Sequence, residues 1–363
     1  MADPAKGMAP EDIRAAVKAG ILTEAQAAEL TALSNERAGK LEARTREDEP
    51  FEFFKGFAEI FVAIGLAIFL GGVALMLGVI GGVGILIVIP AIMAAISWWL
   101  AGAFTLRWRM NLPSMVLVSS YAGGVYVSAL TLLGQSSLGL KSVAFLSAAI
   151  AAGATALWFR RFKLPFAMFV IGSFGLMATY ALFTRYNPGG TINDIEGWAR
   201  SFVPRANLTL ASLVFGVAAF AGAMWFDLRD PHRVGRHSAT AFWLHLLSAG
   251  ALVNAVAGNI WGRGGGANIL PTVIVLAVFA IVALVVDRRS FLTAGIVYIA
   301  AVIYWAVAGE GTASLKEWAM ILILLGLFFT VLGTWWIPLR TALMRALPDF
   351  PGKTRLPPYS ERS

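Results

Sequence analysis

The sequence contains no cysteine and few charged residues. The absence of cysteine excludes disulfide bonds, thiolate nucleophiles and cysteine-ligated metals. Asp, Glu, Lys and Arg make up only 14% of the 363 residues, against about 25% in a typical soluble domain. So few charged side chains cannot cover the surface of a soluble protein of this length. Most of the surface must therefore face lipid or other helices.

The short alternating strands that mark a membrane β-barrel are also missing from the sequence, and long unbroken apolar runs such as 61–80 stand in their place. A helix needs about 20 apolar residues to cross roughly 30 Å of hydrocarbon, where the backbone must satisfy its own hydrogen bonds. The sequence therefore predicts an all-α, polytopic transmembrane helical bundle of about ten spans. We expect them at about 57–80, 83–104, 112–134, 142–159, 164–184, 208–226, 239–261, 269–286, 291–308 and 317–336.

The positive charges are distributed unevenly between the two sides of these spans. If the N-terminus is cytoplasmic, all but six of the 29 Lys and Arg residues fall on the cytoplasmic side. This bias sets orientation through the positive-inside rule. We therefore predict a cell inner-membrane protein with both termini in the cytoplasm. Aromatic pairs end four of the five even-numbered spans and support the same count, since Trp favours the membrane boundary: Trp98–Trp99, Trp158–Phe159, Trp225–Phe226 and Trp335–Trp336.

Three segments follow from this pattern: a cytoplasmic helical appendage with a charged linker (1–50), a transmembrane domain (51–338) and a disordered cytoplasmic tail (339–363). In the appendage, Gly20 can end a first short helix, and Thr23 with Gln26 predicts a capping box for a second. The first 50 residues are too polar for a signal peptide, so we expect the first span to direct insertion. Gly81 and Gly82 predict a turn between the first two spans.

Four polar residues inside or beside the spans are the candidate intramembrane site, because polar groups are costly in lipid. Glu59 lies in the first turns of the first span, where it is either a proton or cation site or a group at headgroup level. The seventh span carries His245 and Ser248 on one helical face, with Asn254 roughly opposite. These residues either line a translocation path or form hydrogen bonds between helices.

The loop after the sixth span, DLRDPHRVGRHS, collects charged residues. Arg229, Arg233 and Arg236 are candidate contacts for anionic lipid headgroups, although topology signalling alone explains them. Two Asp and two His residues in this loop match no standard metal-ligand spacing, so we expect no metal site. The outer loop 185–207 predicts a short amphipathic helix, and GRGGGAN from Gly262 predicts a flexible turn. No catalytic motif is found, so we expect no catalytic residues and no cofactor.

Two segments share a sequence pattern, which is compatible with a duplicated hairpin or with chance: LPSMVLVSSYAGGVYVSAL from Leu112 and LPFAMFVIGSFGLMATYAL from Leu164. A different resemblance covers the first 80 residues. It is carried by AAVKAGILTEAQAAEL (Ala15–Leu30), a charged linker and then FVAIGLAIFLGGVALML. This part of the chain resembles a bacterial membrane-protein family, number twenty-one fifty-seven of the domains of unknown function. This resemblance implies a bacterial inner-membrane location and transfers no functional residue.

Three functions are compatible with the sequence. The favoured one is a structural or accessory membrane protein whose residues 1–50 bind a protein partner. The first alternative is a transporter of a small molecule or lipid, and the second is a membrane enzyme acting on a lipid-linked substrate through Asp227, Asp230 and His232. We expect the bilayer as a partner, with anionic lipids at the cytoplasmic loops, and no nucleic acid.

Overall fold

The structure is a computed structural model. It describes residues 10–37, 57–85, 88–183, 206–230, 236–261, 269–308, 313–349, 353 and 356–357. Every regular element in these ranges is a helix, as the composition predicts. The predicted segments 185–205 and 262–268 lie outside the described residues.

Ten of the described helices are long and apolar enough to cross a membrane, which makes the chain a multi-pass integral membrane protein. The predicted number of spans is confirmed, and the predicted ends agree to within three residues, except that the second span begins six residues later than predicted. The spans are Phe57–Ile80, Ile89–Arg107, Asn111–Gly134, Leu140–Phe162, Phe166–Phe183, Thr209–Asp227, Arg236–Gly258, Ile269–Val286, Ser290–Ala308 and Leu315–Thr334.

These helices fall into two compact units. The first membrane unit comprises residues 51–219, and the second comprises residues 220–363, with which residues 1–50 are grouped. Helix α9 (Ala206–Asp227) contributes its first part to the first unit and its last part, from Phe220, to the second. The transmembrane domain predicted at 51–338 thus consists of two units.

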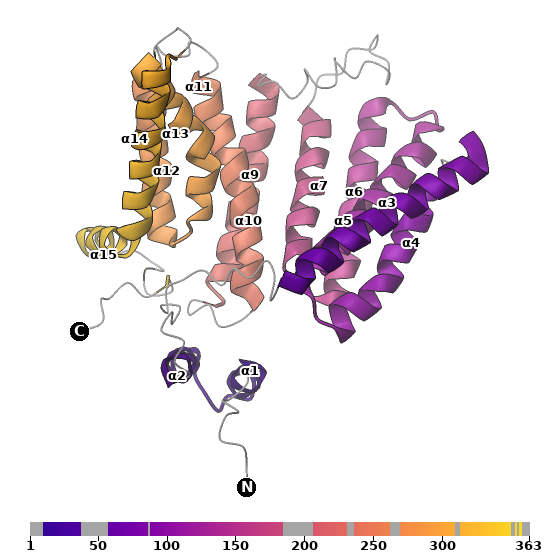
Figure 1. Cartoon of the computed structure of the whole chain (residues 1–363), viewed down its shortest axis with the longest axis horizontal. Coiled ribbons are helices and arrows are strands. Elements are labelled where there is room, and N and C mark those ends of the chain that lie inside the picture. Colours follow the sequence, from indigo (N-terminus) through magenta and orange to yellow (C-terminus); the bar gives the residue numbers. More distant parts are fainter. Residues whose placement is uncertain are drawn as a thin grey trace. The chain divides into compact units, whose positions relative to one another are not determined.

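In the first membrane unit, α4 to α7 run side by side while α3 crosses them at a slant (Figure 1). Gly124 lets α5 approach α4 closely, because a Cβ at this position would overlap the carbonyl oxygen of Pro90. The rings of Trp98, Tyr121 and Trp158 form an aromatic cluster between helices, with centroids 5.0–5.5 Å apart. The helices are α3 (Phe57–Ile85), α4 (Ile89–Ala101) with the π-helix η1 (Gly102–Arg107), α5 (Asn111–Gly134), α6 (Leu140–Phe162) and α7 (Phe166–Phe183).

The turn predicted at Gly81 and Gly82 is displaced. Helix α3 continues through both glycines and ends at Ile85, because glycine is tolerated within a helix whose stability comes from its apolar surroundings rather than from propensity. Pro90 occupies the first turn of α4, where a missing N–H costs nothing.

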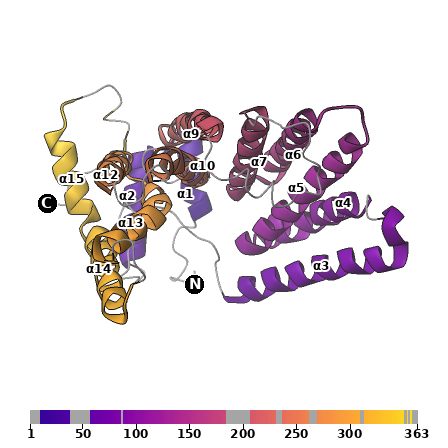
Figure 2. The ribbon, with the colours of Figure 1, turned by 90° about the horizontal axis from the view of Figure 1, so that it is seen from above.

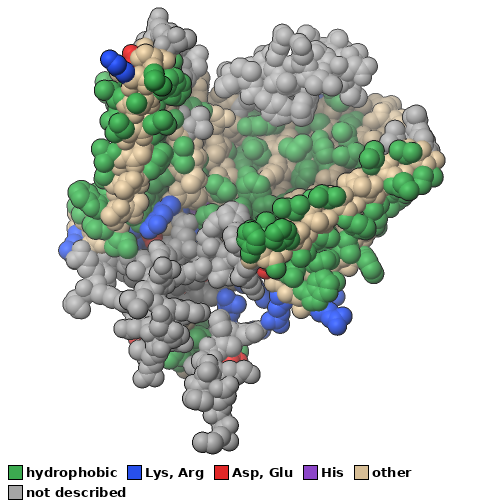
Figure 3. Space-filling model, in the orientation of Figure 1, with side chains coloured by type: hydrophobic (Ala, Val, Ile, Leu, Met, Phe, Trp, Pro, Cys, Tyr) green, Lys and Arg blue, Asp and Glu red, His purple; other side chains and the backbone are tan. Residues whose placement is uncertain are grey.

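In the second membrane unit, α10 lies among the other helices. Of the most apolar 18 residues in its span, 61% are buried, against 6% for Leu315–Thr334. Apolar side chains cover the outward faces of α3 and α14 in Figure 3, as expected of surfaces that meet lipid. The helices of the second unit are α10 (Arg236–Val253) with the π-helix η2 (Asn254–Gly258), α11 (Asn259–Trp261), α12 (Ile269–Val286), α13 (Ser290–Ala308), α14 (Leu315–Thr334) and α15 (Trp336–Ala346).

Helix α15 turns away from the axis of α14 and runs across it, as Figures 1 and 2 both show. Sequence analysis places its residues 339–346 in a disordered tail, but they form this helix. Arg340 anchors it by donating from Nε to the carbonyl oxygen of Leu284 at 3.1 Å. An anchored amphipathic helix at the end of a span is typical of the membrane–water interface.

The N-terminal appendage contains the helices α1 (Pro10–Lys18) and α2 (Glu24–Arg37). Gly20 joins them with φ of 73°, a left-handed conformation that glycine adopts readily. The predicted capping box is confirmed: Thr23 N donates to Gln26 Oε1 at 3.0 Å, and Gln26 N donates to Thr23 Oγ1 at 3.2 Å. Ile13 is buried within this hairpin.

Candidate functional site

The buried polar face of α10 forms the centre of the candidate site. His245 and Ser248 are both fully buried, as their shared helical face predicts. Asn254 is exposed and lies in the π-helix η2, where its Oδ1 accepts a hydrogen bond from the hydroxyl of Tyr298. Asn254 thus forms a hydrogen bond between η2 and α13.

His245 forms a hydrogen bond with the last residue of α9. Its Nε2 lies 2.8 Å from Oδ2 of Asp227, and the side chains of His245 and Asp227 are 0% and 8% exposed. The two residues are 18 positions apart in sequence, and the antiparallel packing of α9 and α10 brings them together. Their contact joins the end of α9 to the side of α10.

Arg288 completes the cluster from the turn between α12 and α13. Its Nε donates to Asp227 Oδ2 at 3.1 Å, and its Nη2 donates to Asp227 Oδ1. Nη2 also donates to the carbonyl oxygen and the hydroxyl of Ser238, at 3.1 and 3.0 Å. A two-pronged guanidinium–carboxylate pair is the strongest ionic geometry available to side chains, so this contact ties the α12–α13 turn to α9 and α10.

Aromatic rings enclose the ionic cluster on its apolar side. The rings of Phe220 and Phe291 have centroids 5.6 and 5.8 Å from that of His245, and they meet each other edge to face at 5.7 Å. Such surroundings have a low effective dielectric constant, which strengthens every charge interaction within them. A change of one charge on His245 therefore has a large energetic effect on this cluster.

A second carboxylate lies beside the cluster. Asp230 is also buried and accepts a hydrogen bond from the backbone N–H of Ser238 at 3.3 Å. Protonation of His245 adds one positive charge next to Asp227 and Arg288. The arrangement can hold or release a proton while its hydrogen-bond framework stays in place.

A second ionic group lies directly beside the first in sequence. Asp287 has φ of 59° and is buried. Its Oδ1 accepts from the indole N–H of Trp336 at 2.8 Å and lies 3.6 Å from Nε of Arg340. Adjacent residues Asp287 and Arg288 thus connect α15 and the α9–α10 pair to one turn. This second group explains why α15 is held against the unit.

Glu59, the remaining candidate, belongs to the first membrane unit and has a structural role there. Its side chain is buried, and Oε2 accepts hydrogen bonds from the backbone N–H groups of Asn111 and Leu112, at 3.0 and 3.2 Å. These donors belong to the first turn of α5, where a helix leaves N–H groups unsatisfied and favours negative charge. Glu59 thus acts as an N-terminal cap supplied by another helix.

The basic loop is only partly described. Arg229 and Arg236 are exposed, and the guanidinium of Arg229 stacks 3.5 Å from the ring of Trp225, while His232 and Arg233 lie outside the described residues. Among the described side chains, no three of His, Asp and Glu lie close enough together to hold a metal ion. The anionic-lipid contacts expected at this loop stay a prediction.

Arg288 is the main functional residue that sequence analysis misses, because a basic residue at a turn is fully explained by topology. One signal was present: Asp227 and Asp287 each precede arginines at the ends of two spans.

No protein-family model, curated protein or solved structure matches the chain. The function is therefore argued from the geometry of the site.

Proposed function

We propose that the protein is a proton-linked transporter of a small molecule or lipid in the inner membrane of a bacterium, with both termini in the cytoplasm. The observation that carries the proposal is the buried Asp227–His245–Arg288 cluster within the second membrane unit. Ionisable groups at such positions mark proton relays and substrate paths in membrane proteins. The asymmetry of Lys and Arg supports the orientation.

The cluster suits a proton-linked cycle because it joins three separate parts of the unit. Protonation of His245 changes its charge next to Asp227, and Asp227 is also the carboxylate that holds Arg288. The equilibrium between two packings of α9, α10 and the α12–α13 turn would then depend on proton binding. A ligand shifts such an equilibrium only through a difference in its affinity for the two states, and the change in charge supplies that difference.

The test is a pH step applied to proteoliposomes on a solid-supported membrane, with displaced charge recorded electrically. His245→Gln keeps a polar side chain that cannot titrate. His237→Gln is the matched control, because His237 lies on the same helix but is exposed, with its ring 5.7 Å from that of Phe226. The proposal expects a transient charge movement in the unaltered protein and in His237→Gln, and its loss in His245→Gln.

Two results would contradict proton linkage: no charge movement beyond that of empty liposomes, or an equal signal in His245→Gln. Elution as a single species by size exclusion, and unchanged Trp fluorescence, would establish that the variant is folded. Phe220→Leu provides a second variant, since it alters the aromatic wall and leaves the titrating groups in place. It should retain the charge movement with a shifted pH dependence.

A second candidate, an accessory protein that binds a partner through residues 1–50, is favoured by the N-terminal hairpin. The hairpin is closed by its own capping box, and the side chain of Ile21 at its turn is 75% exposed. Comparing affinity-purified partners of the full chain and of a chain lacking residues 1–50 tests it, and identical partner sets would refute it. The enzyme alternative gains no support, because Asp227 is engaged by His245 and Arg288.

A further inference from the structure

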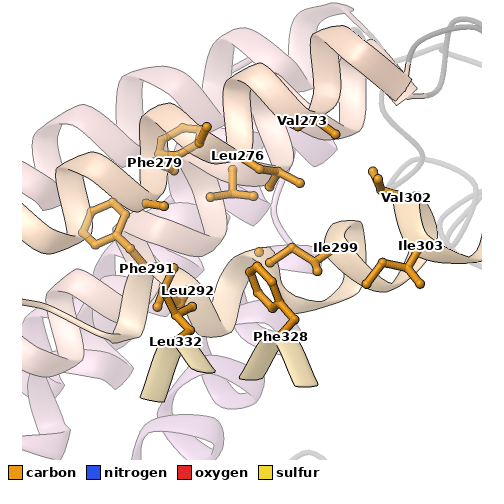
Figure 4. Close-up of a pocket in the computed structure, with 14 residues that line it drawn as sticks. Val273, Leu276, Phe279, Phe291, Leu292, Ile299, Val302, Ile303, Phe328 and Leu332 are labelled. Atoms are coloured by element: carbon orange, nitrogen blue, oxygen red, sulfur yellow. The ribbon is translucent and has the colours of Figure 1, made fainter. Parts of the chain in front are cut away.

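An apolar groove runs along α13 in the second membrane unit. It has a volume of about 340 Å³ and is lined almost wholly by aliphatic and aromatic side chains of α12, α13 and α14, with Val253 from α10. Figure 4 shows Phe291 and Leu292 at one end, Phe328 and Ile299 in the middle, and Ile303 at the other end.

The length of the groove matches the depth of one bilayer leaflet. The lining residues of α13 extend from Phe291 to Ile303, which at about 1.5 Å per residue corresponds to about 18 Å. Half of a 30 Å hydrocarbon layer is about 15 Å. An extended acyl chain lying parallel to α13 would therefore fill the groove from the membrane boundary to the middle of the bilayer.

A basic residue lies at the boundary end of this groove. Phe291 and Leu292 pack in one cluster with Trp336, and Leu332, another lining residue, lies near the end of α14, four residues before Trp336 in sequence. The guanidinium of Arg289 lies 5.6 Å from the centroid of the Trp336 ring. Arg289 is exposed, so it presents positive charge where the apolar groove meets the headgroup layer.

We propose that this groove binds one anionic phospholipid, with an acyl chain along α13 and the phosphate beside Arg289. Charge complementarity identifies the occupant, because an apolar groove that ends at an arginine and a tryptophan fits a chain with an anionic head. The uncharged face of a transmembrane helix from another protein would fill the groove without using Arg289. The groove shares Phe291 with the aromatic wall around His245, but the proposal does not depend on proton-linked transport.

Native mass spectrometry of the full chain tests the charge requirement, with phosphatidylglycerol or phosphatidylcholine added at equal concentrations. The unaltered protein should retain one phosphatidylglycerol in preference to phosphatidylcholine. Arg289→Gln should weaken that binding about fivefold, since one basic side chain at the surface contributes about 1 kcal/mol towards an anionic lipid. Arg229→Gln is the matched control, because Arg229 is also exposed and stacked on a tryptophan, but it follows α9, and no described residue of α9 lines the groove.

A second pair of variants tests the groove itself. Ala277 lines it, whereas the neighbouring Val278 does not and is 53% exposed. Ala277→Phe should abolish retention of the single phosphatidylglycerol, and Val278→Phe should leave it unchanged. Equal losses in Arg289→Gln and Arg229→Gln, full retention in Ala277→Phe, or a dimer mass without bound lipid would each overturn the proposal.

Discussion

Removing the negative charge of Asp227 should destabilise the second membrane unit more than any change to an exposed ion pair. Three hydrogen bonds end on this carboxylate, one from His245 and two from Arg288. Hydrogen bonds between membrane helices contribute on average about 0.6 kcal/mol each, so their loss alone amounts to about 2 kcal/mol. Breaking a buried ion pair leaves an uncompensated charge and costs about 3–5 kcal/mol. We therefore expect Asp227→Asn to lower the free energy of unfolding by about 2–4 kcal/mol.

A double-mutant cycle separates the pairing from the cost of either substitution. The measurement is unfolding in mixed dodecyl sulfate and maltoside micelles, followed by Trp fluorescence, for Asp227→Asn, Arg288→Gln and the double variant. Asp349→Asn is the control, since the Asp349 carboxylate is 99% exposed and solvent screens its contact with Lys353.

The account expects the double variant to be no less stable than the worse of the two single variants, with a coupling energy above about 1.5 kcal/mol. Neighbours in one ionic network couple in this range, whereas independent sites add to within about 0.5 kcal/mol. Additivity of Asp227→Asn and Arg288→Gln to within that margin would refute the assignment of these residues to one cluster.

Three other substitutions test features outside the cluster. Glu59→Gln should lower the stability of the first membrane unit by about 1 kcal/mol in the same unfolding assay, because it removes the charge that caps α5; an unchanged midpoint would contradict that role. Gly124→Ala should destabilise the chain because its Cβ would overlap the Pro90 carbonyl, whereas Gly123→Ala, with nothing within 4 Å, should not; equal effects would refute the close approach of α4 and α5. Gly20→Ala should strain the φ of 73° by about 1 kcal/mol and speed proteolytic cleavage of the α1–α2 hairpin, and an unchanged cleavage rate would argue against the left-handed turn.

Hydropathy and local motifs were sufficient to predict the number and ranges of the spans, because each span must satisfy its own backbone in lipid. The capping box at Thr23 and the left-handed Gly20 were predictable for a different reason: each depends only on residues within four positions in the sequence. The end of α3 was not predictable. A glycine such as Gly81 ends a helix only where packing does not override the low helix propensity of glycine.

The composition of the candidate site was only half predictable. Periodicity placed His245 and Ser248 on one face of α10, but it carries no information about a partner on another helix. Asp227 and Arg288 are 61 residues apart and meet only through tertiary packing. Glu59 similarly meets α5 across more than 50 residues, so the sequence indicated its cost in lipid but not the helix end that compensates for it.

The most direct test of the proton-binding role is the protonation state of His245 in the bilayer. Because the chain has three histidines, solid-state NMR of protein labelled with ¹⁵N only at histidine yields few signals, and His245→Gln assigns the one of interest. We predict that this signal changes from the neutral to the doubly protonated pattern across the interval between the highest and the lowest pH at which the protein stays folded. A His245 signal that keeps one pattern throughout that interval would contradict a proton-linked function for the cluster.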